Sequence, residues 1–154
     1  MLDKKEQIKG YKCELSFKVI DNGEVIKEVK DENLLLANGR LMLLSNLVDP
    51  NSPYGRCDWM CFGDSEVAAD VEDEFAEFGD YYVRPTKGFN LDLDTKSSVE
   101  VYWELSEVEF NGKTLKTIGL CSQNTTFNRV VLDVEDHTLK TPTMKLVGKW
   151  TIEI

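Results

Sequence analysis

The feature that most constrains how this chain folds is the regular alternation of apolar and polar residues along several of its segments. Apolar side chains occupy every second position of Val99–Leu105, and a similar pattern returns in the final segment, Leu146–Ile154. It also occurs at residues 11–20, where the apolar positions are Cys13, Leu15, Phe17 and Val19. Alternation with a period of two is typical of β-strands that rest one face on a core. The sequence therefore predicts a mainly β fold.

A turn signal follows the first of these strands. Asp21-Asn22-Gly23 predicts a three-residue hairpin loop, with the glycine in the left-handed region. In that register Val19 lies opposite Val25, and Leu15 lies opposite Val29. Both pairs are apolar and share one face, which favours this register. We therefore expect an N-terminal hairpin with these cross-strand pairs.

A second turn signal lies in the C-terminal half. Asn111-Gly112 separates the segment 98–110 from the segment 113–121, and Asn-Gly between two such runs is the strongest short-range hairpin signal. We expect these two segments to form a hairpin. Strands at 127–134 and 145–154 follow.

Shorter segments also predict strands. Alternation of Cys57, Trp59 and Cys61 with polar or longer side chains indicates a buried strand at 56–62. Residues 81–85 and 89–93 each fit a short strand. Because Pro85 has no N–H to donate, its strand is expected at the edge of a sheet.

Residues 33–48 change from a period of two to a helical period. The apolar positions with helical spacing are Leu41, Leu44, Leu47 and Val48. We expect one short helix that packs this stripe against a sheet. Asn33 or Asn38 is suited to cap its start, and the prolines in Asp49–Pro53 end it.

Residues 64–79 form the most acidic stretch. Its apolar positions, Val67, Val71, Phe75 and Phe78, have the spacing of a short amphipathic helix, and an irregular surface loop is the alternative. Carboxylates are the ligands that calcium prefers, but the spacing of an EF-hand loop is absent. The other interpretation is a solvated acidic face that orients docking on a basic partner.

Length and charge limit the classes of function. The 154 residues fit a single domain, 1–154, in which residues 1–9 are polar and predict a loose arm. Lys and Arg number 18 and Asp and Glu 28, so the net charge is −10, which opposes binding to nucleic-acid phosphates and anionic lipids. No apolar segment is long enough to span a bilayer, and Met1–Gln7 lacks the apolar segment of a secretory signal. We therefore expect synthesis and folding in a cytosol.

Residue types that carry chemistry are sparse. The single histidine, His137, lies in a turn-like segment, which removes most Ser-His-Asp, Cys-His and zinc arrangements. Cys57 and Cys61 would lie about 13 Å apart along a strand, too far apart to bind one zinc ion. The four cysteines are expected as buried or half-buried thiols, and no catalytic, cofactor-binding or metal-binding residue is predicted. A small hydrolase that uses two carboxylates is an alternative, although nothing in the sequence selects one pair.

Several short motifs follow one another along the chain in a characteristic order. They are Asn33–Leu41, Cys61–Asp64, Tyr82–Pro85, Val101–Leu105, Thr117–Leu120, Asn128–Asp133 and Leu146–Ile154. This order resembles that of structural proteins of tailed-bacteriophage virions, of the tail-fibre and baseplate-associated kind. In those proteins a helix follows the first strands, and an Ile-Gly-Leu strand leads into a final Trp-x-Ile-x-Ile strand. The resemblance implies a virion part that acts through protein–protein contacts, without catalytic residues.

The residues and the resemblance together predict an antiparallel β-sandwich, jelly-roll-like, with one short packed helix. Its expected role is that of a non-enzymatic component of the virion tail, tail fibre or baseplate, which binds copies of itself and other virion proteins, with no cofactor, nucleic acid or membrane. The residues expected at subunit contacts are Tyr81, Tyr82, Trp150, Ile152 and Ile154, and the final strand is expected to pair across a subunit boundary. The alternatives are a head-decoration protein and a glycan-binding module with exposed tryptophans.

Overall fold

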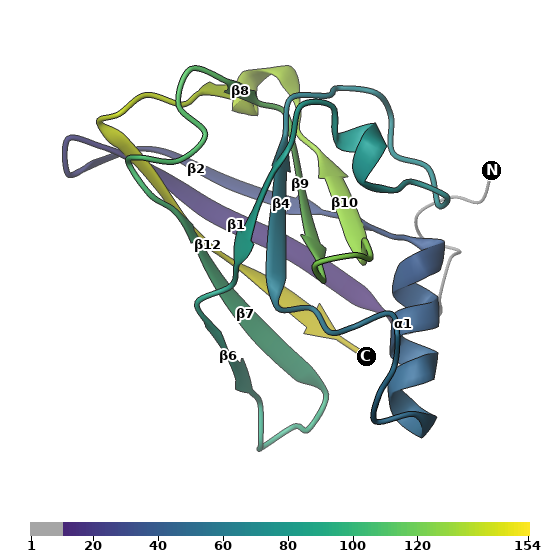
Figure 1. Ribbon diagram of the computed structural model, residues 1–154. Helices are drawn as coiled ribbons and strands as arrows, with labels where there is room; N and C mark the ends of the chain where they lie inside the picture. Colours follow the sequence, from purple (N-terminus) through teal and green to yellow (C-terminus); the bar gives the residue numbers. More distant parts are fainter. Residues whose placement is uncertain (1–10) are drawn as a thin grey trace.

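The protein folds as two antiparallel sheets that pack face to face (Figure 1). The computed structural model describes residues 11–154, so the arm predicted at residues 1–9 lies outside the described residues. Sheet A consists, in spatial order, of β2 (Glu24–Glu32), β1 (Lys12–Asp21), β12 (Met144–Glu153), β7 (Ser98–Leu105) and β6 (Gly88–Leu91). Sheet B consists of β3 (Leu34–Leu35), β10 (Asn128–Val131), β9 (Thr117–Cys121), β4 (Trp59–Gly63) and β5 (Tyr82–Pro85).

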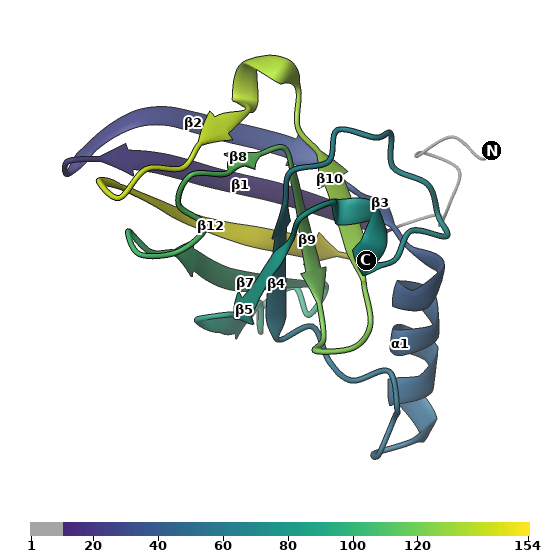
Figure 2. The same cartoon turned by 45° about the horizontal axis from the view of Figure 1, so that its top comes forward.

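The remaining elements of residues 11–154 are small. They are the strand pair β8 (Thr114–Leu115) and β11 (Thr138–Leu139), the helix α1 (Ala37–Val48), and the 3₁₀ turns η2 (Phe75–Phe78) and η3 (Val134–Asp136). Figures 1 and 2 show the strands of sheet B crossing those of sheet A at a steep angle. The prediction of a mainly β, antiparallel sandwich with one helix is confirmed.

The core lies between the two sheets and follows the alternation that the sequence predicted. Its buried members include Leu15, Phe17, Trp103, Leu146 and Trp150 from sheet A, and Met60, Phe62, Ile118, Leu120 and Val130 from sheet B. The rings of Phe17 and Phe62 both pack on Trp103, with centroids 5.6 and 5.4 Å away. Gly148 makes room for the indole, because a Cβ at this position would lie 2.4 Å from it.

The N-terminal hairpin forms, but its register differs from the predicted one. Val25 pairs with Ile20 and Val29 pairs with Phe17, each one or two positions away from the predicted partner. The loop is the two-residue Asn22-Gly23, with φ angles of 50° and 83°. Two positive φ angles are those of a type I′ turn, which matches the twist of the flanking strands. A bulge just before Ile20 then shifts the pairing while the apolar face of β1 stays directed at the core.

Helix α1 begins at Ala37, between the two predicted starts, ends at Val48 as predicted, and presents the opposite face to the sheets. The members of the stripe predicted to pack inward are exposed: Leu41, Leu44, Leu47 and Val48. The buried helical residues are instead Gly39 and Met42. A Cβ on Gly39 would lie 2.2 Å from the main-chain oxygen of Phe127, so this glycine lets the helix approach the chain closely and sets which face turns inward. The N-cap residue is Leu36, so the predicted asparagine caps are wrong.

In residues 11–154, no helix has the length and apolar character to cross a membrane.

The Asn111-Gly112 turn does not join neighbouring strands of one sheet. The turn forms, with Gly112 at φ 81°, but the chain leaves sheet A at Leu105 and enters sheet B at Thr117. The predicted hairpin of 98–110 with 113–121 is therefore wrong. An Asn-Gly pair specifies the local turn, whereas the apolar faces of the strands decide their partners. Here β7 pairs with β12, and β9 pairs with β4 and β10.

The other predicted strands are present with adjusted bounds. The buried strand predicted at 56–62 is β4, and the strand predicted at 81–85 is β5, which lies at the edge of sheet B as Pro85 indicated. The strand predicted at 89–93 is β6, the edge of sheet A.

The last strand, β12, is the central strand of sheet A. It pairs with β1 from Met144 to Glu153 and with β7 from Leu146 to Glu153. Both of its edges are therefore occupied within the chain. The prediction that the final strand pairs across a subunit boundary is wrong, because it has no free edge to offer.

Candidate functional site

The acidic segment 64–80 covers the face of sheet B that points away from sheet A. It is an irregular loop with η2 near its end, so of the two interpretations of the sequence the loop holds. Phe78 of η2 is buried in a small second core with Cys61 and Cys121. Because successive strand residues point to opposite faces, the side chains of β4 and β9 that do not enter the main core enter this one. Sheet B is thus covered on both faces.

Two glycines of sheet B make room for the loop. A Cβ on Gly119 would lie 2.5 Å from the ring of Phe78, and a Cβ on Gly63 would lie 2.0 Å from its main-chain oxygen. No other residue type fits these positions without displacing the loop. The glycines therefore select this docking of η2.

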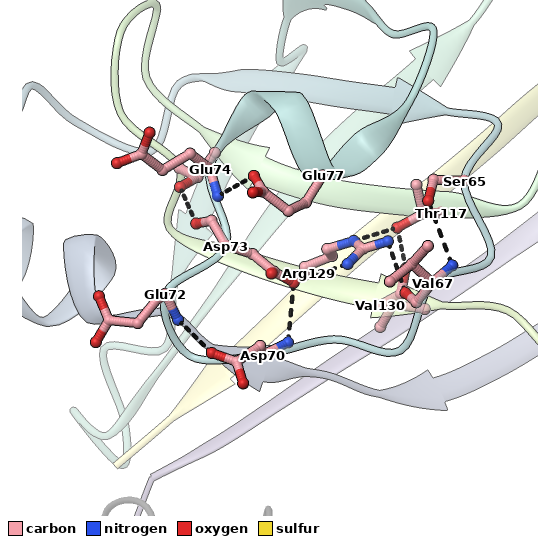
Figure 3. Close-up of polar contacts among 11 residues, drawn as sticks. Ser65, Val67, Asp70, Glu72, Asp73, Glu74, Glu77, Thr117, Arg129 and Val130 are labelled. Atoms are coloured by element: carbon pink, nitrogen blue, oxygen red, sulfur yellow. Dashed lines mark hydrogen bonds and ion pairs between the residues drawn. The ribbon is translucent and has the colours of Figure 1, made fainter. Parts of the chain in front are cut away.

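A buried ion pair fastens the middle of the loop to the sheet (Figure 3). Arg129 of β10 places Nη1 2.7 Å from Oδ2 of Asp73, and both side chains are almost fully removed from solvent. Its Nε donates to Oγ1 of Thr117 at 3.1 Å, and its Nη2 donates to the main-chain oxygen of Val67 at 2.9 Å. The guanidinium also lies 5.4 Å from the centroid of the Phe78 ring. A buried charge is tolerated when it is both paired and hydrogen-bonded, and Arg129 meets both conditions.

Carboxylates of the loop bind the main chain of the loop itself. Glu74 and Glu77 form a reciprocal capping box around η2, in which the Glu74 N–H donates to Oε2 of Glu77 at 2.8 Å. Oδ1 of Asp64 accepts a hydrogen bond from the N–H of Asp80 at 2.8 Å. Within residues 11–154, no group of three or more His, Cys, Asp or Glu side chains is placed to hold a metal ion. The geometry favours a capping role for these carboxylates over a calcium site.

Tyr81 and Tyr82, which the sequence places at a subunit contact, are exposed and also have partners within the chain. Tyr81 stacks on Phe75 with a centroid distance of 5.5 Å. The hydroxyl of Tyr82 donates to Glu109, whose carboxylate also binds Arg84. Burial acts to raise the pKa of Glu109, but the hydrogen bonds and the positive charge around it prevail and hold the pKa below its usual value. The same hydrogen bond raises the pKa of Tyr82.

Trp150, also predicted at a subunit contact, is fully buried, so this prediction is wrong. Its position in the central strand of sheet A places it under sheet B, where Nε1 donates to Sδ of Met60 at 3.0 Å. Trp103 is buried beside it, and Trp59 is half-buried against the second core. A glycan platform needs an exposed aromatic face. Two of the three tryptophans, Trp103 and Trp150, therefore cannot form the exposed platform that the glycan-binding alternative requires.

Sheet A extends beyond sheet B at one end, and its core-facing side is uncovered there. Leu15, Trp150, Val101 and Phe89 are neighbours in one row across the sheet, with exposed fractions of 0, 0, 6 and 69%. In the next row, Leu91 is 54% exposed. Figure 1 shows the β6–β7 hairpin extending past the ends of β4 and β9. Side chains of β6 therefore continue the core face of the sandwich into solvent.

Two further residues predicted at a contact lie at this uncovered end. Ile152 pairs with Val99 and is half-buried. The N–H of Ile154 donates to the main-chain oxygen of Ser97 at 2.9 Å, and its side chain is exposed. We define the open end by Phe89, Leu91, Leu93, Ile152 and Ile154. The first three were not predicted, because alternation locates a strand but does not say how far the opposite sheet extends.

The outer side of α1 is a second uncovered apolar surface. It consists of the exposed side chains Leu41, Leu44, Leu47 and Val48, which we call the helix face. Leu47 and Val48 are the most exposed, at 80% and 85%. Figures 1 and 2 both place the C-terminus close to α1. The sequence identified these residues as one stripe but directed the stripe inward.

The residues with nucleophilic or acid–base chemistry have structural surroundings. All four cysteines are free thiols. Burial raises the pKa of Cys13 to about 11 and raises the pKa of Cys57, Cys61 and Cys121 above the usual thiol value. At neutral pH these groups stay protonated, and a protonated thiol is a poor nucleophile and a poor metal ligand. The ring of His137 hydrogen-bonds a main-chain oxygen at 3.2 Å.

A concave groove of about 640 Å³ lies on the outer face of sheet A. Its polar lining residues are Ser16, Lys18, Glu28, Lys30, Tyr102 and Lys149. Lys30 lies 3.4 Å from Glu14, and Lys149 lies 3.1 Å from Glu100, so these lysines bind carboxylates of the same face. Among the described residues, only one acidic side chain lines the groove. It therefore does not bring together the two carboxylates that glycoside hydrolysis requires.

Comparisons of the chain with models of protein families, with curated proteins and with solved structures give no match. The resemblance to tail-fibre and baseplate-associated proteins therefore stays a prediction based on the order of the motifs. The uncovered surfaces of the chain are an independent basis for a function.

Proposed function

We propose that this protein is a non-enzymatic structural component of a tailed-bacteriophage virion, located in the tail, tail fibre or baseplate. It acts by binding copies of itself and neighbouring virion proteins. The observation that carries this proposal is the presence of two uncovered apolar surfaces, the open end and the helix face, on an otherwise closely packed fold. Clustered apolar side chains on a soluble surface are typical of sites that bind other proteins. The order of the motifs supplies the class of partner.

The charge of the chain supports protein partners over other macromolecules. A net charge of −10 disfavours binding to nucleic acid and to anionic lipids. The acidic loop keeps the side chains of Glu66, Glu72 and Glu74 exposed beside the well-fastened Asp73. An acidic rim of this kind orients the approach of a basic neighbour. The protein is made in the cytoplasm of the bacterial host and resides in the virion.

The surroundings of the reactive residue types support a role without catalysis. Buried or half-buried protonated thiols, a histidine hydrogen-bonded to the main chain and carboxylates that cap η2 all serve the fold. In their place, the chain offers surfaces whose only evident use is contact.

The test is the composition and structure of phage particles. Particles released from the host that carries the gene are purified, analysed by mass spectrometry and imaged by electron cryomicroscopy. We expect the chain in a fixed ratio to other virion proteins, with its sandwich in tail density and the open end or the helix face at a contact. Density on the capsid would instead support the head-decoration alternative. Absence of the chain from particles would contradict the proposal.

A further inference from the structure

Strand β6 presents an unpaired edge to solvent. The N–H of Asp92 donates to the main-chain oxygen of Ser98 at 3.0 Å, on the side of β7. In an antiparallel pair the bonding residues alternate, so Asn90 also bonds toward β7. The main-chain N–H and C=O groups of Phe89 and Leu91 therefore point away from β7. In the described part of the chain, no strand lies on that side of β6.

This edge lacks the charges and the proline that two other sheet edges carry. At the opposite edge of sheet A, β2 displays Lys27, Glu28 and Lys30, and at the edge of sheet B, β5 contains Arg84 and Pro85. Charges and proline are the usual means of preventing edge-to-edge pairing. The sequence of β6, Gly-Phe-Asn-Leu, contains neither.

We infer that β6 pairs antiparallel with β6 of a second copy, about a two-fold axis at Asn90, and joins two A sheets into one continuous sheet. In this register Phe89 lies opposite Leu91 of the second copy, and each such pair exchanges main-chain hydrogen bonds. The exposed apolar side chains of both copies then form one patch on the core-facing side.

The charges on the outer side of β6 match the same register. Lys87 precedes the strand and lies on the side of Glu104, 3.7 Å from its carboxylate. Asp92 follows the strand and, by alternation, lies on the same side as Asn90. Antiparallel pairing about Asn90 brings Lys87 of each copy beside Asp92 of the other. Opposite charges therefore meet at both ends of the shared ribbon, which favours a second copy of this chain as the occupant.

The inference rests on the proposed assembly function and names the edge by which two copies meet. Its first test is a cross-link in the full chain. Across the two-fold axis, Asn90 faces itself as a non-hydrogen-bonded pair, with Cα atoms about 4.5 Å apart, within disulfide range. With glutathione disulfide as the oxidant, Asn90→Cys is expected to give a covalent dimer on non-reducing gels. The matched control is Glu135→Cys on η3, an exposed position far from β6 in sequence, which is expected to stay monomeric.

The second test is specific to the register. Phe89→Lys with Leu91→Lys places like charges opposite each other across the axis, and we expect association to weaken by about tenfold or more. Phe89→Lys with Leu91→Glu changes the same positions but places opposite charges together, so association is expected to recover. Sedimentation velocity over a range of concentrations measures both, and urea unfolding checks that the two variants have equal monomer stability.

The outcomes separate this inference from the proposed function. A dimer that forms no cross-link through Asn90→Cys overturns the β6 pairing and leaves assembly through another surface. A chain that stays monomeric in solution and forms no cross-link, yet is present in particles, also overturns the pairing while the virion role stands. Equal association of the two lysine-containing variants overturns the register.

Discussion

The acidic loop over sheet B and the open end of sheet A differ in how far their apolar side chains are covered by the rest of the fold. The loop belongs to the most charged stretch of the chain. It is nevertheless held to sheet B by a buried ion pair and by Phe78, which packs closely on Gly63 and Gly119. At the open end, by contrast, the apolar side chains of Phe89 and Leu91 remain in solvent. Composition alone would not predict that Asp73 of the acidic loop is buried or that Phe89 of the open end is exposed. Whether a side chain is covered depends on the element that lies opposite it, so Phe78 of the acidic loop is buried against sheet B while Phe89 and Leu91 have nothing opposite them.

The largest effect on this comparison is expected from Arg129→Met. The change leaves the carboxylate of Asp73 buried without its partner, and breaking a buried pair in this way costs about 3–5 kcal/mol. Urea unfolding of the purified chain measures the loss. Arg40→Met on α1 is the matched control, since Arg40 has only intermediate burial, and should change stability by about 0.5 kcal/mol or less. An Arg129→Met chain as stable as the control would mean that the ion pair does not hold the loop.

Gly119→Ala should also destabilise the packing of the acidic loop on sheet B, here through a steric clash. The added methyl meets the Phe78 ring at 2.5 Å, and overpacking of this kind costs about 1–3 kcal/mol. Combining it with Phe78→Leu removes part of the clash, so the loss in the double variant should be smaller than the sum of the two single losses. Exact additivity, measured by thermal or urea unfolding, would show that the ring does not rest on this glycine.

Glu109→Gln tests the anchor of β5 through its pH dependence. The folded-state pKa of Glu109 lies below the ordinary value of 4.5, so its ionised form contributes stability above that pH. This contribution is lost as the pH falls through the lower folded-state pKa. At neutral pH the free energy of unfolding of the wild-type chain should exceed that of the variant by about 1.5–3 kcal/mol, and this difference should shrink in acid. A difference independent of pH in urea unfolding would contradict the assignment.

Leu47→Lys should have the smallest effect on the isolated chain. This side chain already lies in solvent, so unfolding free energy should change by about 0.5 kcal/mol or less. Incorporation into particles, measured by quantitative mass spectrometry, should fall because the charge disrupts the helix face. Met42→Lys on the buried side of α1 is the contrasting variant and should destabilise the monomer itself. Normal incorporation of Leu47→Lys would remove the helix face from the assembly surfaces.

Sequence reasoning could identify the strands and the fold class because alternation is a local property of each strand. It placed Leu15 and Trp103 on the core side, and the edge position of β5 followed from Pro85. It could not place Trp150, because burial of a strand residue depends on the length of the sheet opposite. The partner of Asn111-Gly112 was missed for a similar reason, since a local turn does not determine which sheet receives the next strand.

The helix and the open end also show that local spacing does not determine which face of an element is buried. The leucine stripe of α1 has the spacing of an inward face, but the contact of Gly39 with the main chain of Phe127 turned the other face inward. Of the predicted contact residues, Tyr81, Tyr82, Ile152 and Ile154 keep exposed or half-exposed side chains. The exposure of Phe89 and Leu91 could be recognised only once the extent of sheet B was known. Their role in assembly stays a prediction.

Hydrogen exchange of the isolated chain and of assembled particles, read by mass spectrometry, tests the central claim most directly. The amides of Phe89 and Leu91 should exchange rapidly in the isolated monomer and become protected on assembly. Peptides that cover 117–131 should be protected in both states, because sheet B is already covered on both faces. Rapid exchange at residues 88–93 in both states, with new protection confined to the acidic loop, would contradict the account.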